Sequence, residues 1–491
     1  MLVRRLALAV ILVFAATCGD DGDRAASPTP TTSDPARTST SPTTSTTTLA
    51  DITTTIPVPS TAAPQPAAGS DFSCPPIAPR AEPRPDRPRH TLDIRVDVAG
   101  RSVIGTLNTI FAPDIATDRL VYRLWPAGPR PASGGAAIRV PFVTVNGQAV
   151  AAQRPEATRL EVPVPGGLSA GETVEARVDF ELDLPGTIND RIASGDGWVR
   201  LGSFYPTLEW QPGLGWNTEP PTSGFAEASV SPTADYVLRV QVPEGFDVLA
   251  SGVAVGPGEW RAEAVRDVAL TVGRFATATA TAGADAGRPV EVVVAAHDGI
   301  VDPNQFATKI AGVLEDMARR YGAYPWPRYT LAVTPGLSGG IEYPMHVLQG
   351  PETLGRTTTH EVAHMWFYGL VGNHQGVDPW LDEGLASWAE AVVEGSLGSM
   401  RSTSIPAAGR GRLGEPMTYW ARQGASYYRS VYVQGAQALD ALGDVAAVDC
   451  VLAHHVAKFA HRIATPEEFG ATAEAVIPGA RATLNRYGAG V

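Results

Sequence analysis

The feature that most constrains this chain is a pair of histidines four residues apart, His360 and His364, in the run Thr-His-Glu-Val-Ala-His. On a helix, residues i and i+4 lie on one face, so the two imidazoles can reach the same ion. Tetrahedral zinc is the usual metal for such a pair. Glu361 follows the first histidine, and in this H-E-x-x-H arrangement the glutamate acts as general base toward a zinc-bound water.

A second helical pattern, from Leu381 to Val393, supplies a candidate third ligand in Glu383. Apolar residues recur there at helical spacing, namely Leu385, Trp388, Ala389 and Val392. Eighteen residues separate His364 from Glu383. We predict that two imidazoles and this carboxylate, from His360, His364 and Glu383, hold one zinc ion per chain.

Two alternative sets of zinc ligands fit the sequence less well. The metzincin extension needs a glycine at the position of Phe367 and a histidine at the position of Leu370. A thermolysin-type carboxylate would fall one residue later than Glu383, at Gly384. A chance match, or a helix that merely exposes polar residues, accounts for the H-E-x-x-H run alone but leaves Glu383 without a role.

The same stretch resembles the aminopeptidase N family of gluzincins, which also includes leukotriene hydrolase. The residues that carry the resemblance are Trp366-Phe367, Gly372-Asn373 and Trp380-Leu-Asp-Glu-Gly-Leu-Ala386, together with the ligand spacing. Asp382 replaces the family's common asparagine, and Tyr368-Gly369 replaces its usual Gly-Asn, but neither change alters an expected ligand. The resemblance implies a zinc metallopeptidase that hydrolyses N-terminal residues from peptides, an aminopeptidase.

The resemblance also assigns substrate-binding residues upstream of the histidines. Gly339-Gly-Ile-Glu-Tyr343 resembles the family's G-x-M-E-N segment. It implies that the backbone at Gly339 and Gly340 pairs with an extended peptide and that Glu342 binds the free α-amino group. Tyr343 stands in place of the family's asparagine, so an endopeptidase on the same scaffold remains an alternative. A non-catalytic surface binding protein is the third hypothesis.

Two further residues receive roles downstream. Tyr432-Val-Gln-Gly435 resembles the family's Y-x-K-G, which implies that Tyr432 donates a hydrogen bond to the oxyanion, with Tyr427 and Tyr428 as competitors for this role. Glu390 lies two helical turns beyond Glu383 and is also a glutamate in the family pattern. We expect it to accept the second N–H of a ligating histidine.

Periodicity divides the folded part of the chain in two. Alternating stretches such as 92–98 and 174–180 predict an all-β N-terminal domain of antiparallel strands, saddle- or sandwich-like, over residues 79–297. From Asp302 to Tyr321 the period becomes helical. The resemblance implies that residues 298–491 form a thermolysin-like, mostly α catalytic domain with a small β-sheet, so the fold class is multidomain α+β. Because the sequence ends at Val491, we expect a short form without the family's C-terminal helical domain.

The N-terminal region predicts export. Residues 1–18 carry two arginines and a short apolar run, as in a signal peptide, and end in an imperfect lipobox at Cys18. Ordinary signal cleavage nearby is the alternative. Residues 19–78 are rich in Thr, Ser and Pro and predict a disordered stalk. We expect an extracytoplasmic protein, secreted or anchored at the cell surface, in which Cys74 and Cys450 form either a disulfide or two free thiols.

The net charge of the chain indicates which classes of partner it can bind. The net charge is −13, from 38 basic and 51 acidic side chains, and the sequence has no basic stripe. We therefore expect peptide substrates and no nucleic acid. We expect contact with a membrane only through a lipid on Cys18, and a monomeric protein.

Overall fold

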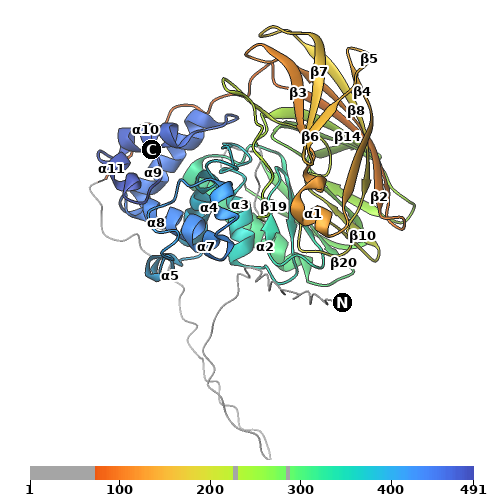
Figure 1. The fold of residues 1–491 in the computed structure, drawn as a ribbon. Coiled ribbons are helices and arrows are strands. Elements are labelled where there is room, and N and C mark those ends of the chain that lie inside the picture. The colour runs from red at the N-terminus through yellow and green to blue at the C-terminus, as the bar shows by residue number, and fades with distance from the viewer. Residues whose placement is uncertain (1–71, 225–229, 284–287) are drawn as a thin grey trace, which may run out of the picture. The chain divides into compact units, whose positions relative to one another are not determined.

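The computed structural model describes residues 72–224, 230–283 and 288–491 (Figure 1). The predicted signal peptide and most of the predicted stalk lie outside these residues. The residues from Ser73 to Val491 belong to one structural unit. Strands dominate its first part and helices its second, which is the α+β organisation predicted from the change in period.

An eight-stranded sheet is the largest element of the N-terminal part. Its spatial order is β16 (Val253–Gly256), β17 (Glu259–Val265), β14 (Ala234–Gln241), β1 (Arg89–Asp97), β2 (Ser102–Phe111), β8 (Val174–Asp183), β4 (Ala137–Val145) and β5 (Gln148–Ala149). In β1, buried Leu92, Ile94 and Val96 alternate with more exposed residues, as the period of two predicts.

One strand pair corrects the prediction that this part is antiparallel throughout. β1 and β14 run parallel, with Leu92 opposite Leu238. Parallel neighbours need a long crossover between them, and about 135 residues separate the end of β1 from the start of β14. Period-two alternation does not distinguish the two directions, so the sequence pattern could not predict this pairing.

Smaller sheets complete the β-rich part. One has the order β15 (Asp247–Ala250), β18 (Leu270–Gly273), β10 (Trp198–Leu201) and β9 (Ile192–Gly195). Another has the order β11 (Thr207–Leu208), β3 (Thr117–Arg123), β7 (Arg159–Leu168) and β6 (Gln153–Glu156). β12 (Trp210–Gln211) and β13 (Gly215–Trp216) form a hairpin. Two short helices, η1 (Trp125–Ala127) and α1 (Pro129–Ser133), follow β3.

A five-stranded sheet packs against the helical part of the chain. Its order is β19 (Phe275–Ala282), β20 (Val290–His297), β21 (Arg328–Val333), β23 (His346–Gln349) and β22 (Gly340–Ile341). β19 and β20 precede residue 298, so the domain boundary predicted there would divide this sheet. The strand pattern of residues 275–297 is compatible with either domain. Only the pairing of β20 with β21 shows to which sheet these strands belong. β22 forms one edge of the sheet.

The helices of the C-terminal part begin with α2 (Pro303–Tyr321), whose N-terminus is capped by the Asp302 side chain, which accepts from Asn304 N. The others are α3 (Arg356–Ala363), α4 (Trp380–Val393), α5 (Leu397–Ser402), α6 (Met417–Trp420), α7 (Gly424–Tyr428), the π-helical turn η2 (Arg429–Val433), α8 (Gln434–Asp440), α9 (Val445–Phe459), α10 (Pro466–Val476) and α11 (Ala480–Asn485). Among the described residues, none of these helices combines the length and apolarity that a membrane span needs.

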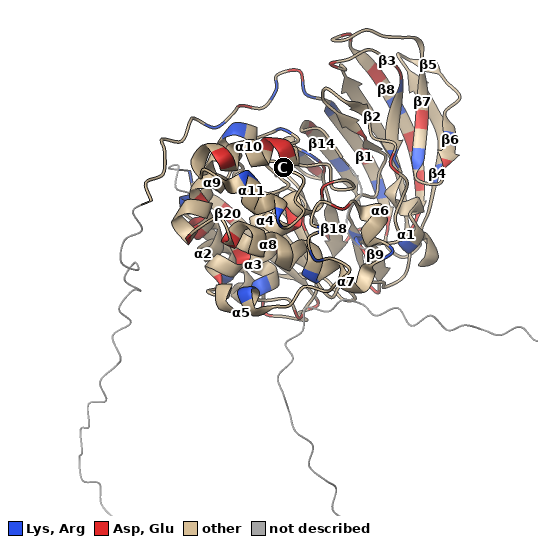
Figure 2. Cartoon of the chain, turned by 60° about the vertical axis from the view of Figure 1, so that its left-hand side comes forward, with Lys and Arg blue, Asp and Glu red and all other residues tan. Residues whose placement is uncertain are grey.

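A disulfide joins Cys74 to Cys450 on α9, with Cα atoms 5.7 Å apart. Of the two alternatives that the sequence left open, the structure has the bridge. It fixes the start of the described chain to the helical part. On the opposite side of the molecule, the exposed strands carry both signs of charge (Figure 2), as where Arg139 pairs with Asp183 at 2.7 Å and Arg177 with Asp179 at 2.9 Å.

Candidate metal centre

Helices α3 and α4 pack together and bring the three predicted ligands to one point. The Nε2 atoms of His360 and His364 lie 3.0 Å apart. Glu383 Oε2 lies 3.1 Å from the first of these nitrogens and 3.4 Å from the second. All three residues are buried, with exposed fractions of 8%, 1% and 7%. Ligand atoms that bind zinc tetrahedrally at about 2.0–2.1 Å are about 3.4 Å from one another, so this triangle has the size of a zinc site.

The other nitrogen of each imidazole shows why the cluster fits a cation. His364 Nδ1 lies 2.7 Å from Asp382 Oδ1, and His360 Nδ1 lies 3.4 Å from Glu390 Oε2. Carboxylates in these positions favour a proton on Nδ1 and leave a lone pair on each Nε2. Two nitrogens and a carboxylate oxygen that face one another in a buried site need a proton or a metal ion between them. Although burial opposes it, contacts with Glu383 and Glu390 raise the pKa of His360 to about 9, and nearby carboxylates raise the pKa of His364 well above its ordinary value. The cluster therefore favours positive charge, and its donor set fits zinc.

Asp382 is a residue whose role the sequence reasoning missed. The motif gave no consequence to its replacement of the family's asparagine, but its carboxylate faces His364 directly and also accepts a hydrogen bond from Gln375 Nε2 at 2.8 Å. Adjacent residues of a helix point in different directions, so the position of Asp382 next to Glu383 did not predict this contact, which depends on how α4 packs against α3. Glu390 lies beside His360, but its Oε1 accepts from Arg356 Nε at 2.6 Å and His360 Nδ1 has no hydrogen-bond partner, so its role as acceptor for the imidazole stays a prediction.

Glu361 and Glu342 form the second half of the site. Each offers a carboxylate oxygen that lies, with a His364 nitrogen, in a group of atoms all within 4.8 Å of one another. Burial raises the pKa of Glu361 to about 7 and that of Glu342 to about 8, although the nearby histidines favour the ionised forms. One oxygen of each, Glu361 Oε2 and Glu342 Oε1, has no hydrogen-bond partner. Unpaired buried carboxylate oxygens are available to accept protons or ammonium groups.

The two predicted glycines differ in their packing. A Cβ atom on Gly340 would lie 2.3 Å from Cδ of Glu361, so glycine is required for β22 to pass this close to the predicted base. A Cβ on Gly339 would meet no atom within 4 Å, and the structure gives no packing reason for glycine there.

Tyr432 reaches the centre from the π-helical turn η2. Its hydroxyl donates to Glu383 Oε1 at 2.5 Å, and its ring stacks on that of His360 with centroids 5.5 Å apart. Tyr427 packs against Tyr432, and its hydroxyl is buried without a partner. A single π turn in an α-helix is a frequent feature of functional sites, and no sequence pattern predicted it here.

Tyr343, which replaces the asparagine of the family pattern, points away from the metal centre. Its hydroxyl lies 2.9 Å from Ser203 Oγ and 3.5 Å from Arg191 Nη1, both in the β-rich part. Successive residues of an extended segment point in opposite directions, so Glu342 faces His364 while Tyr343 faces the β-rich part. The tyrosine therefore does not occupy the space beside Glu342.

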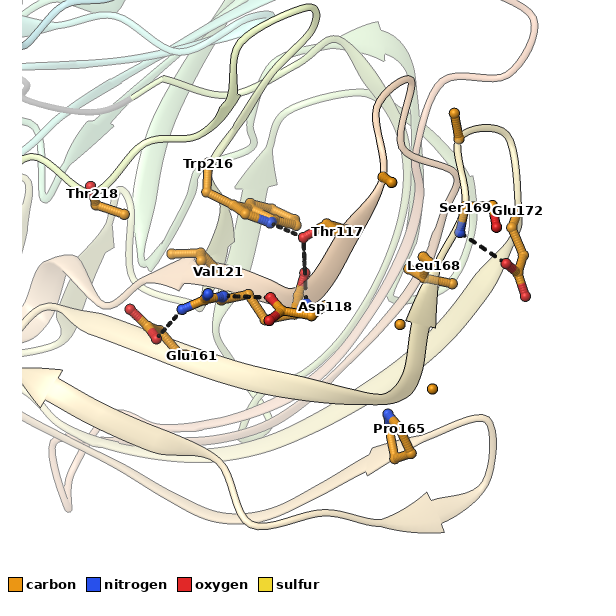
Figure 3. Close-up of a pocket in the computed structure, with 15 residues that line it drawn as sticks. Thr117, Asp118, Val121, Glu161, Pro165, Leu168, Ser169, Glu172, Trp216 and Thr218 are labelled. Atoms are coloured by element: carbon orange, nitrogen blue, oxygen red, sulfur yellow. Dashed lines mark hydrogen bonds and ion pairs between the residues drawn. The ribbon is translucent and has the colours of Figure 1, made fainter.

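A cavity of about 980 Å³ lies in the β-rich part, between β3, β7 and the turn at Pro165 (Figure 3). Its arginine, Arg119, already pairs with Asp118 at 2.8 Å and Glu161 at 3.1 Å. Trp216 at its rim donates to Thr117 Oγ1 at 2.8 Å. These polar groups thus pair with one another. Among the described residues of this cavity they do not converge on one point, whereas the α3–α4 ligands do.

Sequence comparison finds similarity to named aminopeptidases and to leukotriene A-4 hydrolase. No family model matches the chain. Aminopeptidase B of Rattus norvegicus is 27% identical over 203 residues, which cover 37% of this chain and 30% of that protein. Aminopeptidase B of Homo sapiens is 32% identical over 119 residues, which cover 22% of this chain and 18% of that protein. Leukotriene A-4 hydrolase of Xenopus laevis is 33% identical over 97 residues, which cover 18% and 15%. The matches thus span less than a third of these relatives.

Solved structures extend the comparison to most of the chain. The M1 zinc metallopeptidase of Deinococcus radiodurans superposes with a TM-score of 0.61 at 21% identity, over 83% of this chain and 94% of that one. The fold is that of the M1 zinc metallopeptidases. A mutant of that enzyme bound to a Tyr-Ser-Ala substrate superposes on this M1 fold with a TM-score of 0.63 at 22% identity, over 82% and 94% of the two chains. The resemblance to the gluzincin family, stated from the motif alone, is confirmed.

Proposed function

We propose that this protein is a zinc aminopeptidase, with a thermolysin-like catalytic domain that holds one zinc ion between His360, His364 and Glu383. The observation that carries the proposal is the triangle formed by two Nε2 atoms and one carboxylate oxygen, with the carboxylate of Glu361 beside it. Sequence similarity to aminopeptidase B and the shared fold support it.

The chemistry divides between the metal and the chain. When bound, zinc would polarise the scissile carbonyl and lower the pKa of a water toward neutrality. Glu361 takes the proton of that water and later returns it to the departing amine; such general acid–base catalysis contributes about 10²–10⁴-fold. Tyr432 donates its hydroxyl proton toward the oxygen on which negative charge develops, a contribution of about 3 kcal/mol. For this, its hydroxyl must leave Glu383.

Glu342 defines which end of the peptide is cleaved. Its carboxylate lies close to Glu361 and His364, and one oxygen is free to accept from the α-amino group of the substrate. β22, at the edge of its sheet, offers backbone groups to an extended peptide. Because the Tyr343 hydroxyl contacts Ser203 and not Glu342, we favour cleavage after the first residue over endopeptidase activity.

We also propose that the protein works outside the cytoplasm, as a monomer that is either secreted or anchored through Cys18. The Cys74–Cys450 disulfide supports this, because such bridges persist mainly in oxidising compartments. Cell fractionation of the native chain and of Cys18→Ser tests the anchor. Release of the variant from the membrane into the soluble fraction is expected, and an unchanged cytoplasmic distribution of both would contradict export.

A pair of reporter substrates tests the function. The purified protein is offered aminoacyl reporters with a free α-amine and their N-acetylated forms, before and after removal of metal by a chelator. We expect hydrolysis of the free-amine forms alone, its loss on chelation and its return with zinc. Equal hydrolysis of both forms would indicate an endopeptidase, and no metal-dependent hydrolysis of any form would leave only a binding role.

A further inference from the structure

A second cavity, of about 360 Å³, lies where the β-rich part, the segment before β1 and the end of α9 meet. Five cationic side chains and three carboxylates line it, together with His461 and aromatic side chains. The cationic residues are Arg84, Arg87, Arg266, Lys458 and Arg462, and the carboxylates are those of Asp86, Asp114 and Glu468. The lining therefore carries an excess of positive charge in a chain whose net charge is negative.

The carboxylates of the cavity are committed to other contacts. Asp86 pairs with Arg84 at 3.4 Å. Asp114 accepts from the indole of Trp210 at 2.9 Å and from Gly213 N at 2.7 Å. Glu468 accepts from Thr465 N at 2.9 Å, in the capping box of α10. Apart from Arg84, none of the cations in the lining pairs with one of these three carboxylates.

Three of the cations have no carboxylate partner among the described residues. Arg266 is 2% exposed, and its guanidinium donates only to backbone carbonyls, those of Tyr368, Ser231, Leu370 and Arg462. Arg462 donates to the carbonyls of Glu82 and His461, and the Lys458 ammonium lies over the ring of Phe459, 4.9 Å from its centroid. Asp267 and Asp382 favour the charged form of Arg266 from a distance, but no carboxylate among the described residues contacts these three cations, and an anion in the cavity would stabilise them.

His461 adds a second indication of a ligand. It is a non-glycine residue with a φ of 61°, in the left-handed region, and its Nδ1 is buried without a partner. Burial and the surrounding arginines hold its pKa at about 4, so the ring is neutral and Nδ1 is free to donate or accept toward a molecule in the cavity. Backbone strain of this kind is often retained at binding sites.

We propose that this cavity binds a small dianionic phosphate, either inorganic phosphate or the phosphate of a monoester. Arginine forks match the oxygens of phosphate. Because Arg84 pairs with Asp86 and Arg87 pairs with Asp235 at 2.7 Å, the charges left to attract an anion are those of Arg266, Arg462 and Lys458. The volume is large enough for an organic group beside the phosphate, and Trp210 and Phe111 offer it an aromatic wall.

Hydrogen bonds connect the cavity to the loop that follows His364. His461 N donates to Leu370 O at 2.7 Å, and Gly372 N donates to Arg462 O at 2.9 Å. Arg266 Nε holds Tyr368 O at 2.7 Å, and a Cβ on Gly372 would lie 2.2 Å from Cζ of Arg266. Phosphate bound in the cavity therefore stabilises the loop that directly follows His364.

Calorimetric titration with inorganic phosphate and with phenyl phosphate tests the site. Ionic strength is held constant with chloride, and the titration is made on zinc-loaded and on chelator-treated protein, so that phosphate bound to metal is recognised. We expect saturable binding in both forms, weakened about tenfold or more by Lys458→Gln and by Arg462→Gln, which is about 1.4 kcal/mol. Arg95→Gln, which removes an exposed arginine of β1, is the matched control and leaves binding unchanged.

The two ligands distinguish free phosphate from an ester, since tighter binding of phenyl phosphate indicates that the aromatic wall takes part. Lys458 is exposed, so its variant is expected to fold even if changes at Arg462 are not tolerated. Non-saturable heats, heats confined to the zinc-loaded form, or equal weakening by Arg95→Gln would overturn the proposal. Because the titration contains no peptide, its failure is independent of the peptidase assignment.

Discussion

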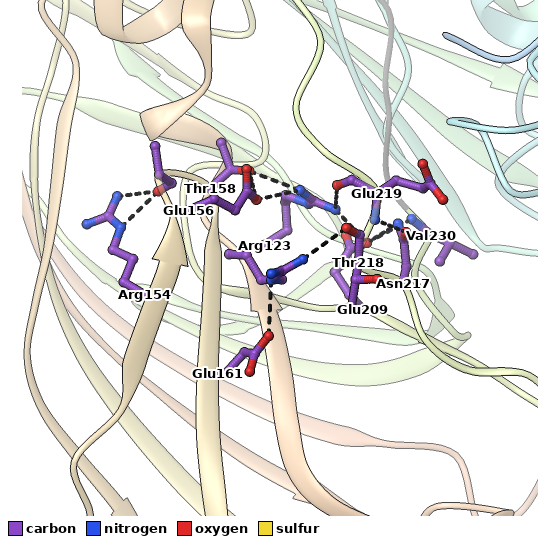
Figure 4. Close-up of polar contacts among 12 residues, drawn as sticks. Arg123, Arg154, Glu156, Thr158, Glu161, Glu209, Asn217, Thr218, Glu219 and Val230 are labelled. Atoms are coloured by element: carbon purple, nitrogen blue, oxygen red, sulfur yellow. Dashed lines mark hydrogen bonds and ion pairs between the residues drawn. The ribbon is translucent and has the colours of Figure 1, made fainter. Parts of the chain in front are cut away.

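Two buried polar clusters in this molecule differ in how their charges are matched. In the β-rich part, Arg123 lies 3.6 Å from Glu209 and 3.6 Å from Glu156 (Figure 4). Its guanidinium donates to Thr158 Oγ1 and to Glu219 O, each at 3.0 Å. Asn217 Nδ2 donates to Glu209 at 2.6 Å. The buried guanidinium thus faces carboxylates of opposite charge, although Arg123 Nε and Glu209 Oε1 have no hydrogen-bond partner among the described residues, and no group of side chains in this cluster converges on one point as metal ligands do.

The α3–α4 cluster has the opposite character. The lone pairs of His360, His364 and Glu383 converge within 3.4 Å of one another, and further carboxylates stand behind the imidazoles. The difference teaches that burial of charged residues does not by itself mark a functional site. Convergence of groups that repel one another without a cation does.

The largest effect is expected at the predicted base. Glu361→Gln should lower kcat about 10²–10⁴-fold, because the amide does not accept the proton of the attacking water. Zinc content should stay at one per chain, since Glu361 is not a ligand. Glu352→Gln, an exposed glutamate nearby, is the control. Loss of zinc together with activity would show that Glu361 belongs to the ligand set.

Disrupting the cluster of Arg123 and Glu209 should change stability and leave activity unchanged. Arg123→Met leaves Glu209 buried beside no cation and should lower the free energy of unfolding by about 3–5 kcal/mol. Zinc content and kcat of the folded fraction should not change. Arg177→Met, at an exposed ion pair, should cost at most about 1 kcal/mol. Denaturant titration measures the free energy of unfolding of both variants. Equal losses would mean that the buried and the exposed ion pair contribute equally to stability.

Tyr432→Phe should lower kcat about 100-fold with little change in KM, because its hydroxyl acts on the transition state. Tyr427→Phe is the matched comparison, since both hydroxyls lie near the centre but that of Tyr427 contacts no other group. A larger kcat loss in Tyr427→Phe than in Tyr432→Phe would exchange their roles.

Asp382→Asn should weaken zinc affinity about 10–100-fold, because an amide supports the His364 ring less strongly than a carboxylate does. Competition with a chelator of known affinity measures this. Asp378→Asn, four residues earlier and outside the ligand contacts, should have no effect. If Asp382→Asn retains zinc as the native chain does, the close contact with His364 does not influence the metal.

The last prediction concerns the pH dependence of stability and the cluster of Arg123 and Glu209. Burial raises the pKa of Glu209 from 4.5 to about 7, so the folded state holds a proton that the unfolded chain releases. Its contribution to stability is therefore present below pH 4.5 and is lost as pH rises toward 7. Glu209→Gln should flatten this part of the stability–pH curve, measured by denaturant titration between pH 5 and 7. An unchanged slope would contradict the shift.

Much of the molecule could be predicted from local pattern. The helical period from Asp302 to Tyr321 corresponds to α2 with Asp302 as its cap, and the pattern from Leu381 to Val393 corresponds to α4. The spacing of the ligands, together with the family resemblance, was enough to anticipate that Glu383 lies beside the two histidines. These features follow from side-chain periodicity, which acts over a few residues.

Features set by distant parts of the chain could not be predicted in this way. The parallel pairing of β1 with β14 and the inclusion of β19 in the five-stranded sheet depend on pairing partners far along the sequence. The cavity around Arg266 joins three segments that share no motif. The contact of Asp382 with His364 depends on the packing of α3 against α4, which spacing alone does not describe.

The central claim is that side chains from α3 and α4 hold a single zinc ion. A crystal structure of the native protein with anomalous data collected on both sides of the zinc absorption edge tests it most directly. We predict one anomalous peak per chain, within bonding distance of His360 Nε2, His364 Nε2 and Glu383. A zinc peak at another cluster, or a fully occupied zinc coordinated without Glu383, would contradict the claim.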